Sequence, residues 1–243
     1  MSSEAPWQLR LGAAERGESA ELKAQERRHG FRAPAAVQAW YASGGAEGLR
    51  VPGLPEPVPV DRLGDPRAWE GAPVPLLERE LLVLAAERRG VSHHVAVWLD
   101  GTEDPPVFRE RGSMPDHTFV LIGGTFSEWV LSRRLLRRGR RGAPERTGGT
   151  GRAAGDALLA LAREASLEHV HFDGAHERVV VAAGAEGAPL LRFREDMNGL
   201  ASWRIGARDA GALELWTARA ARLGLPAERF ACPSLSPAIR AGR

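Results

Sequence analysis

Two apolar runs separated by one short charged segment constrain this chain more than any other feature. Leu81–Ala86 consists wholly of apolar residues, and Val91–Leu99 is a second, largely apolar run that ends at Asp100-Gly101. The segment between them, Glu87-Arg88-Arg89-Gly90, is charged and closes with glycine. Short apolar runs bounded by turn residues favour neighbouring strands joined by a tight turn. The sequence therefore predicts a β-hairpin over residues 81–99.

Helical spacing precedes and follows this hairpin. A helix is predicted over residues 18–29, with Ser19 as its N-cap and Gly30 as its left-handed C-terminal residue. A second helix begins near Pro34, and a third begins near Thr125 or Ser127. Strands are predicted at 107–108 and 117–122. The aromatic residues at helical spacing, which we assign to the core, are Trp40, Tyr41, Phe126 and Trp129.

The second half repeats the alternation of helix and strand after a break. Residues 139–153 contain Gly, Pro, Thr and Arg without an apolar period, which predicts a linker. Helices are then predicted at 154–166 and 210–223, and strands at 169–172, 177–183, 189–194 and 201–206. The predicted fold class is α+β: an antiparallel sheet flanked by N-terminal helices and a following helix, with a smaller C-terminal α+β segment. The predicted organisation is a domain over 1–138, a linker over 139–153 and an extension over 154–243.

Composition excludes several classes of protein. Of the 243 residues 43% are hydrophobic and 26% charged, so the chain can bury a core and stay soluble. Cys232 is the only cysteine, which excludes an intrachain disulfide. We find neither a signal-like apolar segment at the N-terminus nor a run long enough to span a bilayer. The sequence therefore predicts a cytoplasmic protein that contacts no membrane, and no cofactor motif is recognised.

Three segments of the first half resemble the SUKH superfamily, which includes fungal cell-wall synthesis regulators and bacterial immunity proteins. Ala24–Gly45 is similar to the family's opening helix, its Gly-apolar step and its proline-started second helix. Ala86–Gly90 and Glu103–Val107 resemble the family's hairpin turn and its Asp-Pro-Pro-Val step, and Thr125–Leu131 resembles its Ser-Phe-Ser-Glu-Phe-Leu helix start. The match covers about residues 18–138. The resemblance implies a non-enzymatic binding scaffold with an α+β sheet that presents one face to a partner.

From this resemblance we predict a protein that neutralises a bacterial toxin by occluding its active site, with the cognate toxin domain as its partner. A regulatory interaction module without a toxin target is the alternative. Contacts with the partner are expected on one sheet face and its turns. The residues predicted for these contacts are Glu87, Arg89, Trp98, Asp100, Glu103 and Asp104.

Two further functions are left open by the residues. His169, His171 and Asp173 share one face of a predicted strand, and imidazoles at this spacing can ligate a metal ion, although a solvent-facing strand shows the same alternation. The arginines between Arg133 and Arg152 could contact phosphate, but no aromatic residues interleave them, so a nucleic-acid partner is judged unlikely. Gly148–Gly151 is assigned to the linker because no strand is predicted before it. His93 and His94, adjacent in a strand, point to opposite faces and cannot share one metal ion.

Overall fold

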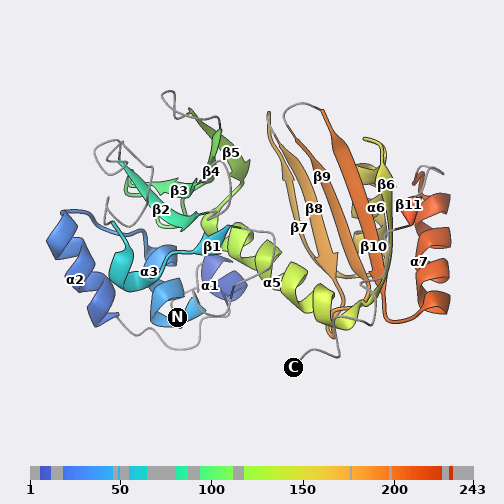
Figure 1. The fold of residues 1–243 in the computed structure, drawn as a ribbon, viewed down its shortest axis with the longest axis horizontal. Coiled ribbons are helices and arrows are strands. Elements are labelled where there is room, and N and C mark those ends of the chain that lie inside the picture. The colour runs from blue at the N-terminus through green and yellow to red at the C-terminus, as the bar shows by residue number, and fades with distance from the viewer. Residues whose placement is uncertain are drawn as a thin grey trace, which may run out of the picture. The chain divides into compact units, whose positions relative to one another are not determined.

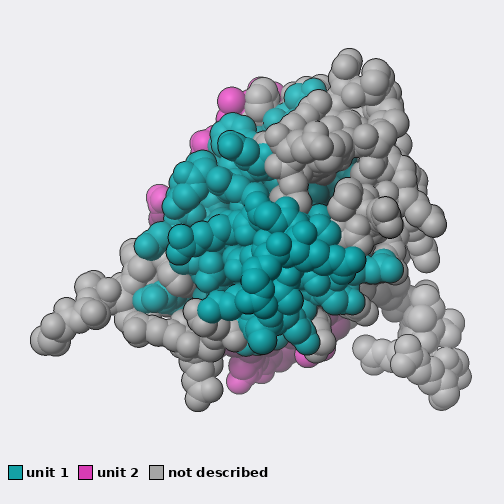
Figure 2. Space-filling view, turned by 90° about the vertical axis from the view of Figure 1, so that its left-hand side faces the viewer, with its two compact units in different colours: residues 1–133 teal, residues 134–243 magenta. Residues whose placement is uncertain are grey.

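The structure is a computed structural model that describes residues 6–11, 19–45, 49, 55–64, 80–86, 94–111, 118–175, 177–196, 199–225 and 230–231. The chain divides into two compact units, residues 1–133 and 134–243, which are coloured separately in Figure 2. Each unit combines helices with an antiparallel sheet (Figure 1), so the predicted α+β class is confirmed. Among the described helices, none combines the length and apolar composition needed to cross a bilayer.

The first unit contains a sheet whose strands follow one another in space in the order of the chain. The strands are β1 (Glu56–Pro57), β2 (Leu81–Ala86), β3 (His94–Trp98), β4 (Val107–Arg111) and β5 (Thr118–Gly123), and each pairs antiparallel with its neighbour. The helices are α1 (Pro6–Leu11), α2 (Ala20–His29), α3 (Ala35–Ala42) and α5 (Phe126–Gly142), with a 3-10 turn, η1, at Val60–Arg62. The pairing of β2 with β3 confirms the predicted hairpin strands, whereas the turn at residues 87–93 lies outside the described residues.

The predicted helix signals act as expected at both ends of α2. The Ser19 hydroxyl accepts a hydrogen bond from the N–H of Leu22 (3.2 Å), which satisfies one of the free donors of the first turn. At the other end Gly30 has φ +70° and donates its N–H to the carbonyl oxygen of Glu26. Glycine adopts this left-handed conformation without a steric penalty, so the chain turns sharply into α3.

An aromatic cluster forms the centre of the first core. The Trp40 ring lies edge-on to Tyr41, Phe126 and Trp129, with centroid distances of 4.7, 5.4 and 6.5 Å. All four residues are buried, as predicted, and they pack in one cluster with residues of β2, β3 and β4. Because Trp40 comes from α3 and Phe126 from α5, this contact fastens both helices to the sheet.

The second unit contains a six-stranded antiparallel sheet among its described residues. The elements are β6 (Glu145–Thr150), α6 (Ala154–Glu164), β7 (Glu168–Asp173), β8 (Arg178–Ala183), β9 (Leu190–Glu195), β10 (Ala201–Ala207), α7 (Ala210–Arg222) and β11 (Phe230–Ala231). The strand order is β11-β6-β10-β9-β8-β7. Helices α6 and α7 cover one face of this sheet (Figure 1), and their apolar residues share a core with Phe193 and Trp203. The helices and strands predicted between residues 154 and 223 are all present.

The segment predicted as a linker, residues 139–153, is helix and strand in the structure. Helix α5 continues to Gly142, and β6 follows and pairs with β10 along its whole length. The sequence of β6 lacks apolar alternation because backbone hydrogen bonds, and not buried side chains, hold it in the sheet. Gly149 lies opposite Trp203, so it leaves room for the indole. Gly148 and Gly149 thus lie within a strand and Gly151 follows it, contrary to the prediction of a linker.

Candidate functional site

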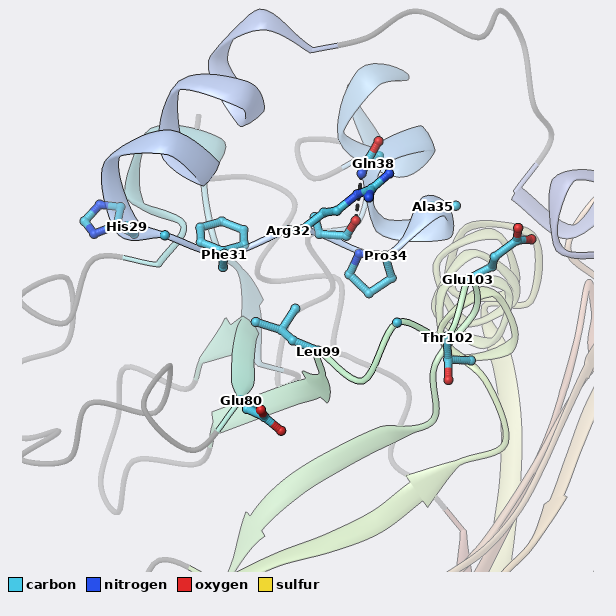
Figure 3. Close-up of a pocket in the computed structure, with 13 residues that line it drawn as sticks. His29, Phe31, Arg32, Pro34, Ala35, Gln38, Glu80, Leu99, Thr102 and Glu103 are labelled. Atoms are coloured by element: carbon cyan, nitrogen blue, oxygen red, sulfur yellow. Dashed lines mark hydrogen bonds between the residues drawn. The ribbon is translucent and has the colours of Figure 1, made fainter.

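A groove of about 710 Å³ opens in the first unit between two segments that are far apart in the sequence. One wall is the connection from α2 to α3, residues 29–35, together with Gln38. The other wall is formed by Glu80 and the segment that follows β3, residues 99–103 (Figure 3). The N–H of Ala36 donates to the carbonyl oxygen of Glu103 at 2.9 Å, so the two walls are joined by a backbone hydrogen bond.

Side chains hold the α2–α3 wall in place. The Glu26 carboxylate accepts a hydrogen bond from the N–H of Ala33 (2.7 Å), and the Gln38 amide donates to the carbonyl oxygen of Ala33 (2.7 Å; Figure 3). The N–H and the carbonyl group of Ala33 are thus both hydrogen-bonded immediately before Pro34. The φ of Pro34, −58°, suits the start of a helix. This wall is therefore a fixed surface and not a loose loop.

The two walls carry opposite charge. Arg32 lies on the α2–α3 wall, whereas the carboxylates of Glu80 and Glu103 belong to the other wall. Glu80 and Glu103 are both exposed. Glu80 has φ +58°, and its carbonyl oxygen accepts a hydrogen bond from Leu99 (2.8 Å). A groove with this charge pattern suits an extended polypeptide, which brings both donors and acceptors.

The acidic turn after β3 is preorganised. The Asp100 carboxylate accepts the N–H of Thr102 at 3.0 Å, and this hydrogen bond holds the pKa of Asp100 below its usual value. Gly101 has φ +87°, as the predicted turn requires. Asp100 and Glu103 are exposed on a backbone that is tied to α3. Fixed charges of this kind attract a basic surface at little entropic cost.

Asp104 has a structural role that the sequence did not predict. Its two carboxylate oxygens accept hydrogen bonds from the backbone N–H and the hydroxyl of Ser127, at 2.9 and 2.7 Å. The adjacent carbonyl of Pro105 accepts the N–H of Phe126 (2.8 Å). Asp104 is half-buried and caps the first turn of α5. These hydrogen bonds anchor the acidic turn to α5, and the contact of Asp104 with a partner stays a prediction.

Trp98 projects from the end of β3 beside this turn. Its side chain is 46% exposed, and its ring lies 4.6 Å from that of Phe108 on β4. Strand alternation places Trp98 on the same face as Ala96 and His94, away from Val95 and Val97. A large aromatic side chain that is supported on one side and open on the other has the form of an interface anchor.

The structure thus brings together Trp98, Asp100 and Glu103 of the predicted contact set. Glu87 and Arg89 lie outside the described residues, as does His93. Sequence reasoning missed Arg32 and Glu80. The register of the hairpin contains the signal for Glu80, because Leu81 pairs with Trp98 and the preceding residue must then face Leu99. For Arg32 the only signal is its place in a short connection between two helices.

The histidine motif of β7 does not assemble a metal centre. Register places His169 opposite Ala182 and His171 opposite Val180, so the predicted common face is the one covered by helices. His169 Nδ1 lies 2.9 Å from the carbonyl oxygen of Leu167. Asp173 forms an ion pair with Arg178 at 3.6 Å, and burial together with Arg178 lowers the pKa of His171. Within the described part of the chain, no three ligating side chains converge.

The exposed features of the first unit gather around the turn that follows β3. An exposed indole, two fixed carboxylates and a groove with oppositely charged walls lie around one turn. General acid–base chemistry requires ionisable groups that converge on one reacting atom, whereas the carboxylates of this turn point outward on an exposed segment. No protein-family model, no curated protein and no solved structure matches this chain.

Proposed function

We propose that the first unit is a non-enzymatic protein-binding scaffold that acts as an immunity protein and neutralises a bacterial toxin by occluding its active site. The observation that carries this proposal is Trp98, a 46% exposed indole on a regular strand beside a fixed acidic turn. Central aromatic residues dominate the free energy of protein–protein binding, and rigid presentation lowers the entropic cost of association. The three sequence blocks that resemble SUKH proteins favour the immunity class of binder.

The acidic residues around Trp98 favour a basic surface on the toxin. Asp100 and Glu103 flank the anchor, and Glu80 adds a third carboxylate on the same side of the groove. Such a cluster complements a basic surface, and it accelerates association with one by electrostatic steering. A toxin whose substrate is anionic has a basic active-site groove, so the proposed partner is an enzyme of that kind.

The test is co-expression of the chain with toxin domains encoded beside its gene. Wild-type protein should restore growth and bind the toxin, and Trp98→Ala should weaken binding about 30-fold or more, the effect of losing one hot-spot residue. Asp100→Asn combined with Glu103→Gln should mainly slow association and weaken its dependence on salt. Leu215→Ala is the matched control, because Leu215 is an exposed apolar residue (59%) on α7 of the second unit.

The immunity proposal fails if none of these toxin domains is bound or neutralised by the wild-type chain. A partner that binds through Trp98 without any relief of toxicity would instead identify the regulatory interaction module. Equal losses for Trp98→Ala and Leu215→Ala would show that the surface around Trp98 is not the binding site.

A further inference from the structure

The face of the second sheet opposite α6 and α7 carries a group of arginines. Alternate residues of β9 and β10 point to opposite faces, and Leu191, Phe193, Trp203 and Ile205 face the helices. Their neighbours Arg192, Arg194 and Arg204 therefore share the other face. Arg192 and Arg204 are directly opposed in the register of the two strands.

A third arginine reaches this pair from α5. Gly139 of α5 lies against Leu190, so the end of the helix crosses the same face. Arg146 of β6 donates to the carbonyl oxygens of Ala143 and Arg140, which fixes the helix end to the sheet. In this position Arg140 lies within electrostatic range of both Arg146 and Arg204, and Arg192 is within range of Arg140.

The opposed Arg192 and Arg204 differ from their neighbours in their ion pairs. Arg194 pairs with Glu177, and Arg152 pairs with Glu195 at the edge of the face. Among the described residues, no carboxylate lies within ion-pair distance of Arg192 or Arg204. Like charges directly opposed across two strands are destabilising. Burial is the main cause that lowers the pKa of Arg192 to about 10, and the neighbouring arginines add to it.

We propose that Arg140, Arg192 and Arg204 form a binding site for a phosphate group. Planar guanidinium groups match the geometry of phosphate oxygens, and a bound anion would remove the repulsion between the arginines. The site lies in the second unit and does not depend on the function proposed for the first.

The surroundings of the arginines favour phosphate over an acidic protein. The next row along the strands carries the hydroxyl groups of Thr150 and Ser202, which line a neighbouring groove of about 690 Å³. Arginine side chains and hydroxyl groups are usual phosphate contacts.

Binding to the full chain tests this site with three probes: tripolyphosphate, a short single-stranded oligonucleotide and a glutamate peptide of similar charge. Arg192→Gln and Arg204→Gln should each weaken binding of a phosphate probe about tenfold or more. A plot of the logarithm of the affinity against the logarithm of the salt concentration, measured between about 50 and 200 mM, should also have a less steep slope in these variants. Because each variant removes a repulsive charge, its melting temperature should equal or exceed that of the wild type.

The matched control is Arg163→Gln combined with Arg222→Gln, which removes two exposed charges from α6 and α7 on the other side of the unit. Affinity for the phosphate probes should stay within about twofold in this control. Binding of tripolyphosphate alone assigns the site to free phosphate compounds, and binding of both phosphate probes assigns it to a nucleic-acid backbone. The proposal is overturned if neither probe binds, if the control weakens binding equally, or if the glutamate peptide binds as tightly.

Discussion

The Nδ1 atom of His94 lies 2.5 Å from Oε2 of Glu110, and both residues are only 2% exposed. The backbone N–H of His94 also donates to the same carboxylate oxygen at 3.3 Å. The two side chains come from adjacent strands, since Val95 pairs with Arg109 and places their neighbours side by side. Polar groups this far from water are tolerated only when they bond to each other. The pair therefore ties β3, the strand that ends in Trp98, to β4.

We expect the first unit to lose stability in mild acid because of His94. Burial lowers the pKa of His94 in the folded state, so between that value and about 6.5 the unfolded chain binds a proton that the folded chain does not. The free energy of unfolding must then fall as the pH drops below about 6.5. For one proton this fall is at most about 1.4 kcal/mol per pH unit. Denaturant unfolding from pH 8 to pH 5 measures this slope.

His94→Gln should flatten that slope, whatever its effect on the absolute stability. His171 of β7, whose pKa is also lowered, supplies the comparison, because His171→Gln should affect only the transition of the second unit. A slope that persists unchanged in the His94 variant would contradict the assignment.

Asp104→Ala should lower the free energy of unfolding by about 1–2 kcal/mol, the usual cost of a lost helix cap. Both hydrogen bonds to Ser127 disappear, and with them the link between the acidic turn and α5. Asp100→Ala, which removes a carboxylate from an exposed turn in the same segment, should change stability by no more than about 0.5 kcal/mol. Urea unfolding of both variants is the measurement, and equal effects would rule out the capping role.

Truncation of Trp40 should cost much more stability than truncation of Trp98. Trp40 is fully buried among three aromatic rings, so Trp40→Ala should cost about 3–5 kcal/mol. Trp98 is half exposed and has a ring contact with Phe108, so Trp98→Ala should cost only about 1 kcal/mol. Thermal unfolding decides between them. A large loss at Trp98 would make it a core residue and weaken its proposed role as an anchor.

Gly155 and Gly211 occupy the second position of α6 and of α7, yet alanine should have opposite effects at the two sites. A Cβ atom on Gly155 would lie 2.9 Å from Cε1 of the buried Phe193, so Gly155→Ala should cost about 1–3 kcal/mol. A Cβ atom on Gly211 would meet only Oδ1 of Asp209 at 3.5 Å, so Gly211→Ala should stabilise by up to about 1 kcal/mol. Opposite shifts in melting temperature are the expected result, and a stabilising Gly155→Ala would show that Phe193 can move.

Most elements of the fold follow from local patterns. Ser19 and Gly30 bound α2 because capping depends on a few neighbouring atoms, and the strands of the second unit alternate apolar and polar residues. β6 was not predictable in this way. Its sequence, Glu-Arg-Thr-Gly-Gly-Thr, has no period, and the strand exists because β10 and β11 supply its hydrogen bonds from distant parts of the chain.

The candidate sites likewise include residues that the local sequence predicts and residues that it does not. The acidic turn after β3 was visible because Trp98, Asp100 and Glu103 are close in sequence. The capping role of Asp104 was not visible, since Ser127 lies 23 residues further along. The opposed arginines at 192 and 204 required the register of β9 against β10, which depends on the turn between them. Groups joined by tertiary pairing leave no spacing signal in the chain.

Helix α5 runs from Phe126 to Gly142 without interruption, and the boundary between the two units falls inside it, after Arg133. Any cut made at that boundary severs a helix and leaves each fragment with a frayed end that its own unit normally buries. The halves of this protein are therefore poor candidates for exchange as modules. Gene fusions or recombination events that keep α5 intact would have to break the chain before Phe126 or after Gly142. One of the two products would then carry the whole helix.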